Sequence, residues 1–321
     1  MQKAFIECHL ANAISELGAI AMFEDISRDT KWLKIEKIVR GWSDDVKYYI
    51  ETADGQKLIL RISDIDKYEV KKKEYEVIGK YARLGFKMSE PISFGLCNEQ
   101  QNVYMLLTWV EGEDLEMALP KLNQEQQYSL GRKAGTILKN IHSIQVPDDE
   151  IPRNTKVSKK KEQIKRYEDS EVRISGDEAA LKFVKDNLYK IWSKSPVYLH
   201  GDFHPGNLIL TPDGDIGVID FNRWEIGDPY EEFYKLESFG TEVSIPYCIG
   251  QIDSYFDNHI PEDFWEILAV YVAHASLYSI KWAEQFGQQD IDIMMKICNK
   301  SFAHYDHFKR RIPTWYRNPP F

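Results

Sequence analysis

Residues 197–221 constrain the fold of this chain more than any other stretch. Two short apolar runs, Leu208–Leu210 and Ile216–Ile219, lie on either side of the sequence Pro212-Asp213-Gly214. Apolar runs of this length around a Pro/Gly turn signal predict two paired strands. The stretch is therefore expected to fold as a loop, a strand, a tight turn and a returning strand.

Three polar side chains flank this expected hairpin. Asp202 and Asn207 come before its first strand, and Asp220 comes directly after its second strand. Because the strands of a hairpin are antiparallel, the residues before and after it lie at the same end. In kinase-type phosphoryl transfer, an Asp orients the acceptor hydroxyl, while an Asn five residues later and the next Asp hold Mg²⁺ against the nucleotide phosphates. The spacing therefore indicates phosphoryl transfer, with Asp202 catalytic and Asn207 and Asp220 as ligands of Mg²⁺.

Two histidines in the same loop allow a different interpretation. His200 and His204 are four residues apart, a spacing that on a helix would suit a zinc ion. Gly201, Pro205 and Gly206 argue against a helix here. We instead expect His200 to brace the loop through backbone hydrogen bonds and His204 to orient Asp202 or the substrate, which makes His204 a second catalytic candidate.

The form His-Gly-Asp-x-His-x-x-Asn, followed by Ile-Asp-Phe, resembles the aminoglycoside phosphotransferase family of antibiotic and small-molecule kinases. The resemblance extends from about Trp32 to the C-terminal helices. It implies an α+β, bilobal, protein-kinase-like fold: a small lobe with an antiparallel sheet, a larger and mainly helical lobe, and ATP or GTP bound between them. The expected division is an N-terminal helical extension over 1–31, a nucleotide-binding lobe over 32–109, and a catalytic and substrate-binding lobe over 110–321.

In the first lobe, alternating apolar residues predict strands over 35–39, 46–51, 58–62, 92–96 and 103–109. The turn after the first strand contains Ser43, which could offer its N–H or hydroxyl to a phosphate. The kinase pattern has a Lys on the third strand, and here the matching residue is Arg61, with Lys57 as a lesser candidate. The alternative is that Arg61 forms an ion pair at the edge of the sheet.

The resemblance places two further nucleotide-binding features in this lobe. A helix is expected over 68–84, where Glu74 best matches the Glu that pairs with the strand cation and Glu76 is the runner-up. The main chain of Thr108, Trp109 and Val110 matches the hinge that pairs with the purine edge.

The segment Gly227-Asp228-Pro229 and the acidic residues after it also resemble this family. We expect Asp228 to brace the catalytic loop by accepting backbone N–H bonds, or else to contact ammonium groups of the substrate. Glu231 and Glu232 are candidates for substrate contact, although the start of a helix favours negative charge without any ligand.

The acceptor is expected to be a small hydroxylated and cationic molecule of the aminoglycoside type. The alternatives are a macrolide, or a metabolic alcohol such as choline, homoserine or a sugar. A choline site needs an aromatic cage, for which the chain offers Trp224, Tyr230, Trp265, Tyr271 and Trp282. A non-catalytic nucleotide-binding protein remains a third class, because Arg61 replaces Lys and the phosphate loop has few glycines.

Composition narrows the remaining choices. The net charge of −10 argues against a nucleic-acid partner and suits a cationic substrate, although most of these charges are expected to serve solubility alone. The basic run over 156–166 lacks aromatic stacking residues, so we interpret it as a solvated helix face. No apolar run is long enough to span a membrane, the N-terminus lacks signal-peptide features, and four widely spaced Cys suit a reducing cytoplasm. A helix expected over 4–23 would pack on the first lobe or on a partner subunit, so a dimer is an open alternative.

Overall fold

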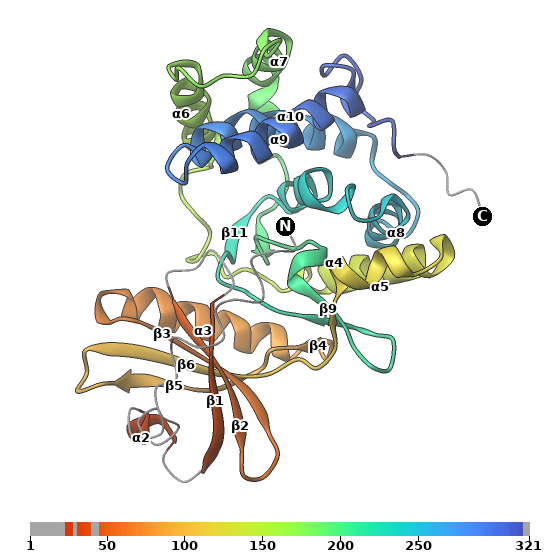
Figure 1. The fold of residues 1–321 in the computed structure, drawn as a ribbon. Helices are drawn as coiled ribbons and strands as arrows, with labels where there is room; N and C mark the ends of the chain where they lie inside the picture. The colour runs from red at the N-terminus through yellow and green to blue at the C-terminus, as the bar shows by residue number, and fades with distance from the viewer. Residues whose placement is uncertain (1–22, 28–30, 40–44, 317–321) are drawn as a thin grey trace. The chain divides into compact units, whose positions relative to one another are not determined.

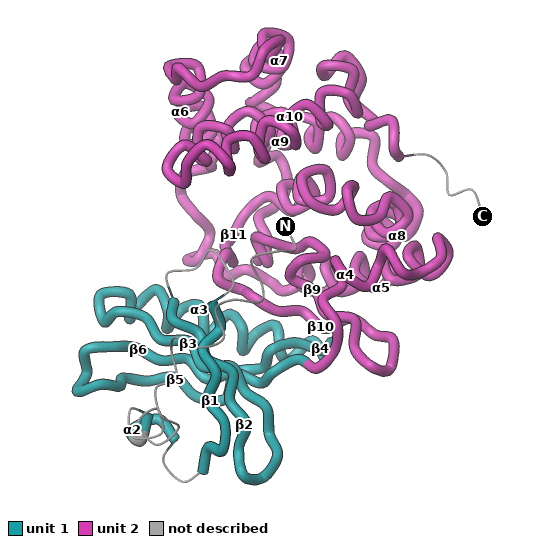
Figure 2. Tube along the Cα trace, in the orientation of Figure 1, with its two compact units in different colours: residues 1–110 teal, residues 111–321 magenta. Residues whose placement is uncertain are grey.

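A computed structural model describes residues 23–27, 31–39 and 45–316 (Figure 1). The chain divides into two compact units, unit 1 over Met1–Val110 and unit 2 over Glu111–Phe321 (Figure 2). Both have the elements of a mixed α+β protein, and the expected fold class is confirmed. The helix expected over 4–23 falls outside the described residues except for its last residue, Phe23, and Ser43 also falls outside them.

Unit 1 is built on a five-stranded antiparallel sheet with the order β1-β2-β3-β6-β5. The strands are β1 (Trp32–Ile38), β2 (Val46–Thr52), β3 (Lys57–Asp64), β5 (Pro91–Cys97) and β6 (Asn102–Thr108). Each overlaps one of the runs predicted from apolar alternation, although β1 and β6 each end one residue before the predicted run does. Unit 1 also contains α2 (Glu24–Ser27), η1 (Ile65–Lys67), α3 (Tyr68–Ala82) and the short β4 (Lys87–Met88).

One buried apolar cluster of unit 1 combines residues at the start of the unit with residues of the sheet. Phe23, which directly precedes α2, and Ile26 from α2 pack with Trp32, Ile50 and Leu60 in this cluster. The helix α3 contacts β5 and β6. It buries Val77, Ile78 and Tyr81 completely, together with the carboxylate of Glu74. A buried charge on this face requires a partner, and the sheet supplies one.

Unit 2 is mainly helical. Its elements before residue 197 are β7 (Glu113–Asp114), α4 (Leu115–Ala118), η2 (Leu119–Lys121), α5 (Gln124–His142), α6 (Val157–Glu168), α7 (Glu178–Asn187) and η3 (Leu188–Lys190). Helix α5 has the bounds expected from its apolar stripe. It starts at a capping box in which the side chains of Asn123 and Gln126 each accept the other's backbone N–H.

Residues 197–221 fold as the turn signals predict. They comprise β8 (Val197–Leu199), η4 (Pro205–Asn207), β9 (Leu208–Leu210) and β10 (Ile216–Val218), and β11 (Glu225–Gly227) follows. Strands β9 and β10 form the expected hairpin, with Val218 opposite Leu208. Strand β7 pairs with the other edge of β9, and β11 pairs with β8. Neither of these two pairings was predicted from the sequence.

The remaining helices and helical turns of unit 2 come after β11 in the chain. They are η5 (Pro229–Phe233), the π-helical turn η6 (Leu236–Gly240), α8 (Ile245–Tyr255), α9 (Glu262–Ala283) and α10 (Gln288–Tyr305). Helix α9 contacts α6, α7 and α10, and it is buried along most of its length. Helices α5 and α8 approach closely, because a Cβ on Gly131 would lie only 2.1 Å from the carbonyl oxygen of Tyr247. No helix within the described residues is long and apolar enough to cross a bilayer.

Candidate active site

The loop between β8 and β9 is fixed by a glycine and a buried histidine. Gly201 has a φ of +80°, and a Cβ there would lie 1.9 Å from the carbonyl oxygen of Arg223, so only glycine fits. His200 is fully buried; its Nε2 lies 3.1 Å from the carbonyl oxygen of Ile219, and its Nδ1 accepts the N–H of Asp202 at 3.2 Å. Burial lowers the pKa of His200, so the ring is neutral. Its contacts are those of the expected loop brace.

Asn207, the last residue of η4, directly precedes β9, and Asp220 follows β10 by two residues, so both lie at one end of the hairpin. The Asn207 side chain donates from Nδ2 to the carbonyl oxygen of Asp202 at 2.9 Å, which ties it to the catalytic loop. The N–H of Ile219 donates to the carbonyl oxygen of Asn207 at 3.1 Å, so Asp220 follows directly after a residue paired with Asn207. Asp220 has a φ of +60°, a left-handed conformation that costs free energy and is typical of functional positions. The three residues predicted from spacing are thus brought together.

Asp202 has a cationic partner that the sequence did not reveal. The Nζ of Lys235, the residue before η6, lies 2.6 Å from Asp202 Oδ1. His204 Nε2 is more distant, at 3.6 Å from the same oxygen, and His204 Nδ1 accepts the N–H of Gly206. Burial raises the pKa of Asp202, but His204 and Lys235 outweigh this effect and hold that pKa well below its usual range. The carboxylate is therefore ionised at neutral pH.

The three acidic candidates after β11 are buried and already have partners. Asp228 accepts the N–H groups of Trp192 and Tyr230 and the hydroxyl of Tyr271, at 2.7, 3.0 and 2.8 Å. Two of these are backbone bonds of the expected kind, but neither comes from the loop between β8 and β9: Trp192 lies before β8 and Tyr230 lies in η5. Glu232 is the residue that reaches the catalytic loop, since its Oε1 accepts the N–H of Phe203 at 3.4 Å.

Glu231 is neutralised by lysines of the basic run. Its carboxylate lies 2.7 Å from the Nζ of Lys160 and 3.5 Å from that of Lys156, which also pairs with Glu225. Burial raises the pKa of Glu231, yet Lys160 and Lys156 outweigh it and lower that pKa to about 2. Lys160 is only 8% exposed. The interpretation of 156–166 as a solvated face is therefore wrong for these two residues, because their ammonium groups face η5 and β11.

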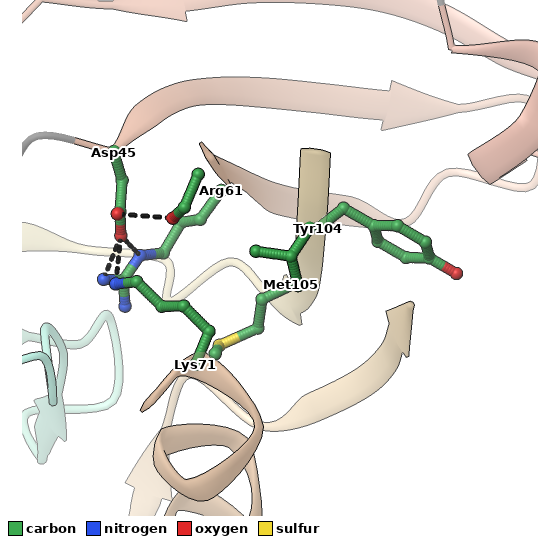
Figure 3. A pocket seen from close by; sticks show the side chains of 7 residues that line it. Asp45, Arg61, Lys71, Tyr104 and Met105 are labelled. Atoms are coloured by element: carbon green, nitrogen blue, oxygen red, sulfur yellow. Dashed lines mark hydrogen bonds and ion pairs between the residues drawn. The ribbon is translucent and has the colours of Figure 1, made fainter. Parts of the chain in front are cut away.

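In unit 1, Arg61 and Glu74 form the predicted pair within a larger ionic cluster, of which Figure 3 shows Arg61, Asp45 and Lys71. Arg61 Nη1 donates to Glu74 Oε1 at 2.6 Å, and Arg61 Nε donates to Asp45 Oδ2 at 2.9 Å. Lys71 from α3 bridges the same two carboxylates, at 2.7 Å from Asp45 and 3.0 Å from Glu74. Ser63 donates to the second oxygen of Asp45 at 2.6 Å. Arg61 thus lies in the interior of the cluster and not in an edge ion pair.

Asp45 and Lys71 are cluster members that sequence reasoning missed. Burial raises the pKa of Asp45, but Arg61 and Lys71 outweigh it and keep that pKa well below the usual range. The cluster therefore balances two cations against two carboxylates. Asp45 is the last residue of the expected phosphate loop, and its carboxylate is bonded to the strand cation Arg61.

The expected hinge is partly occupied by hydrogen bonds of the sheet. The N–H of Thr108 donates to the carbonyl oxygen of Glu90, and that of Trp109 donates to the carbonyl oxygen of Lys57, each at 2.9 Å. Pairing with a purine edge is therefore left to the carbonyls of these residues and to the main chain of Val110. The ring of Trp109 packs edge-on against Tyr49, with 4.9 Å between ring centroids.

The donor set at the end of the hairpin fits magnesium. Asn207 and Asp220 offer an amide oxygen and a carboxylate, and Mg²⁺ prefers oxygen ligands and is commonly held by one or two protein groups plus substrate phosphates. Within the described residues, no group of three or more His, Cys, Asp or Glu could hold a metal alone. A site completed by nucleotide phosphates matches both observations.

These features define a protein with a kinase-like fold: an antiparallel sheet unit with a strand cation paired to a helix Glu, and a helical unit with an Asp, Asn and Asp around a hairpin. A family model for the phosphotransferase enzyme family matches residues 34–265. The chain belongs to this family and is a phosphotransferase, as the resemblance implied. The search of curated proteins gives no match.

Solved structures of phosphotransferases share the fold along most of the chain. The GDP and kanamycin complex of an aminoglycoside phosphotransferase matches with a TM-score of 0.67 and 15% identity, covering 90% of this chain and 99% of that one. An amicoumacin kinase complex with AMP-PNP and Ca²⁺ matches with a TM-score of 0.61 and 14% identity, covering 87% and 90%. A macrolide 2'-phosphotransferase matches with a TM-score of 0.65 and 14% identity, covering 89% and 98%. At these identities the likeness shows the fold.

Proposed function

We propose that this phosphotransferase moves the γ-phosphate of ATP or GTP to a hydroxyl group of a small molecule, and that the molecule is an aminoglycoside-type antibiotic. The observation that carries the reaction type is the meeting of Asp202, Asn207 and Asp220 at one end of the β9–β10 hairpin. Family membership supports the same reaction. A non-catalytic protein would not need an ionised carboxylate, an amide and a second carboxylate at this spacing.

In this proposal each residue has a defined task. Asp202 orients the acceptor hydroxyl and receives its proton as the oxygen attacks the γ-phosphorus, and His204 helps to position Asp202. Asn207 and Asp220 hold Mg²⁺, which when bound neutralises charge on the nucleotide phosphates. In unit 1, Arg61, positioned by Glu74, contacts the α- and β-phosphates, and Ser43 contributes to the phosphate loop. The main chain of Thr108, Trp109 and Val110 contacts the purine.

The acceptor class rests on charge and on the family. A net charge of −10 attracts a polycation, and one structure with this fold was solved with kanamycin. An ammonium group of the acceptor would have to compete with Lys160 for Glu231. The choline alternative gains no support, because Tyr230, Trp265 and Tyr271 are buried among other core side chains.

The described cysteines, Cys97, Cys248 and Cys298, are free thiols, which supports a reducing cytoplasm.

A coupled assay of ATP and GTP consumption tests this function. The purified protein is screened against aminoglycosides, macrolides, amino alcohols and sugars, and the Asp202→Ala variant provides the blank. We expect acceptor-dependent consumption with one nucleotide preferred, and the greatest rate with an aminoglycoside. Nucleotide binding without consumption in the presence of any acceptor would favour the non-catalytic alternative. Consumption only with a macrolide, an amino alcohol or a sugar would overturn the acceptor class and leave the reaction type.

A further inference from the structure

We propose that Lys235 is a further catalytic residue of this enzyme and that its ammonium group binds the phosphoryl group in transfer. The inference rests on the proposed function and deepens it. No motif in the sequence marks Lys235, which lies after the acidic turn η5 and outside the hairpin that carries the other proposed catalytic groups.

Lys235 lies at the reacting carboxylate. Its Nζ is 2.6 Å from Asp202 Oδ1, and the two side chains are 13% and 23% exposed, so the pair is shielded but not closed off. An ammonium group has three N–H donors. One of them is used by Asp202, and the second oxygen of Asp202 is the one that we assign to the acceptor hydroxyl. Lys235 therefore stands beside the reacting oxygen without competing for the same lone pair.

The backbone that carries Lys235 is shaped to hold this position. Lys235 directly precedes the π-helical turn η6, and such turns occur frequently at functional sites. The turn places the ring of Phe239 5.3 Å from the Nζ of Lys235 and 4.9 Å, between ring centroids, from His204. One aromatic ring thus supports both side chains that approach Asp202, and the face of that ring favours a cation.

The opposite side of the same turn is anchored in the core. Glu237 is 1% exposed, and its two oxygens accept from His304 Nδ1 and from Trp315 Nε1, each at 2.7 Å. These bonds tie η6 to α10 and to the segment after it. A lysine held by an anchored turn retains its geometry through the reaction, as a preorganised electrostatic group requires.

The reaction brings the phosphoryl group within reach of Lys235. A hydroxyl bonded to Asp202 lies about 2.6–3.2 Å from a carboxylate oxygen. Its oxygen lies about 3–3.5 Å from the phosphorus that it attacks. The transferred group therefore passes within about 6 Å of Asp202, beside which Lys235 lies.

The bonds that change leave Lys235 intact. The acceptor oxygen forms a bond to the γ-phosphorus while the bond from that phosphorus to the β–γ bridging oxygen breaks. The hydroxyl proton passes to Asp202, and the nucleoside diphosphate leaves with the bridging oxygen. Lys235 keeps all its protons and donates to a non-bridging oxygen, where the charge of the transition state is spread.

The test compares Lys235→Met and Lys235→Arg with the wild-type enzyme. Lys300→Met is the matched control, because Lys300 is similarly shielded, 17% exposed, and pairs only loosely with Glu242, at 3.6 Å. Calorimetry measures the affinity for Mg²⁺·ADP with and without aluminium fluoride, which is an analogue of the phosphoryl group in transfer. Steady-state kinetics measure kcat and the KM for nucleotide with the acceptor identified in the screen. For Lys235→Met we expect Mg²⁺·ADP affinity within about twofold, loss of the extra affinity conferred by aluminium fluoride, and a fall in kcat of about 10²–10³-fold. Lys235→Arg should restore part of the extra affinity with aluminium fluoride and part of kcat. Lys300→Met should behave as wild type in all of these measurements.

Each contrary outcome has a defined meaning. An unchanged tightening by aluminium fluoride in Lys235→Met overturns the inference, even if kcat falls, because the lysine would then act only on Asp202. If the wild-type enzyme uses none of the acceptors, the calorimetric comparison still decides the role of Lys235. A wild-type protein that binds neither Mg²⁺·ADP nor Mg²⁺·GDP would overturn the proposed function and this inference with it. If Lys235→Met does not fold, Lys235→Gln, which keeps an N–H donor without the charge, takes its place under the same criteria.

Discussion

Arg61 and Glu74 meet in the interior of unit 1, with 2.6 Å between Nη1 and Oε1 and both side chains at most 4% exposed. Arg61 also binds Asp45, and Lys71 bridges the two carboxylates, so four charges share one buried site. Removing one member of a buried pair leaves an uncompensated charge, which costs far more than the pair itself gains.

We therefore expect Arg61→Met to lower the free energy of unfolding of unit 1 by about 3–5 kcal/mol and to weaken nucleotide binding. Arg61→Lys should recover only part of the stability, because an ammonium group cannot reproduce the guanidinium fork that binds Asp45 and Glu74 together. Urea denaturation and calorimetry measure the two effects. Lys57→Met, an exposed position on the same strand, should change stability by less than about 0.5 kcal/mol. Equal losses at Arg61 and Lys57 would contradict the prediction.

Asp202 should be required for phosphoryl transfer and dispensable for nucleotide binding. Its partners are Lys235 and His204, and Asn207 contacts only its backbone carbonyl, so changing the side chain leaves the Asn207 bond in place. We expect Asp202→Ala to lower kcat by about 10²–10⁴-fold while nucleotide affinity stays near the wild-type value. Steady-state kinetics and calorimetry provide both quantities. Asp213→Asn, in the turn of the same hairpin, is the control and should retain full activity. Turnover by Asp202→Ala near the wild-type rate would show that Asp202 is not the base.

Asp220 should be required for the effect of Mg²⁺ on nucleotide affinity. We expect Asp220→Ala to reduce the Mg²⁺-dependent increase in affinity by at least about tenfold and to leave Mg²⁺-free affinity unchanged. Calorimetry with and without Mg²⁺ measures this difference. Asp220→Asn separates charge from backbone strain, because Asn also tolerates the left-handed conformation that Asp220 adopts. A variant that binds Mg²⁺·nucleotide as tightly as wild type would assign the metal to other groups.

Local patterns in the sequence were enough to predict the five strands of the unit 1 sheet, helix α5 and the β9–β10 hairpin. Apolar alternation and turn residues act over a few positions, so they can be interpreted without tertiary information. The same holds for Asp202, Asn207 and Asp220, whose spacing along one hairpin fixes where they meet. The pairing of Arg61 with Glu74 was predictable only because the family resemblance identifies both positions.

The contacts of Lys235 and Lys160 could not be predicted from the sequence. Lys235 reaches Asp202 from a π-helical turn elsewhere in the chain, and no periodicity or spacing in the sequence marks that contact. Lys160 belongs to a basic run that has the composition of a solvated face, yet it is buried against Glu231. Both contacts depend on the packing between elements that are distant in sequence, which local patterns do not specify.

The pair between Glu231 and Lys160 predicts a specific loss of stability in acid. The pKa of Glu231 is lowered from 4.5 to about 2 in the folded protein, so its ionised form stabilises the fold by about 3 kcal/mol above pH 5, and this contribution is lost as the pH falls from 5 towards 2. Glu231→Gln should be less stable than wild type at pH 6 by about this amount, and the difference should narrow steadily as the pH falls to 3. Urea denaturation across this pH range measures it. Glu266→Gln, which removes an exposed pair with Lys190, should differ from wild type by less than about 1 kcal/mol throughout. A constant difference between Glu231→Gln and wild type from pH 6 to 3 would show that Glu231 does not titrate with a lowered pKa.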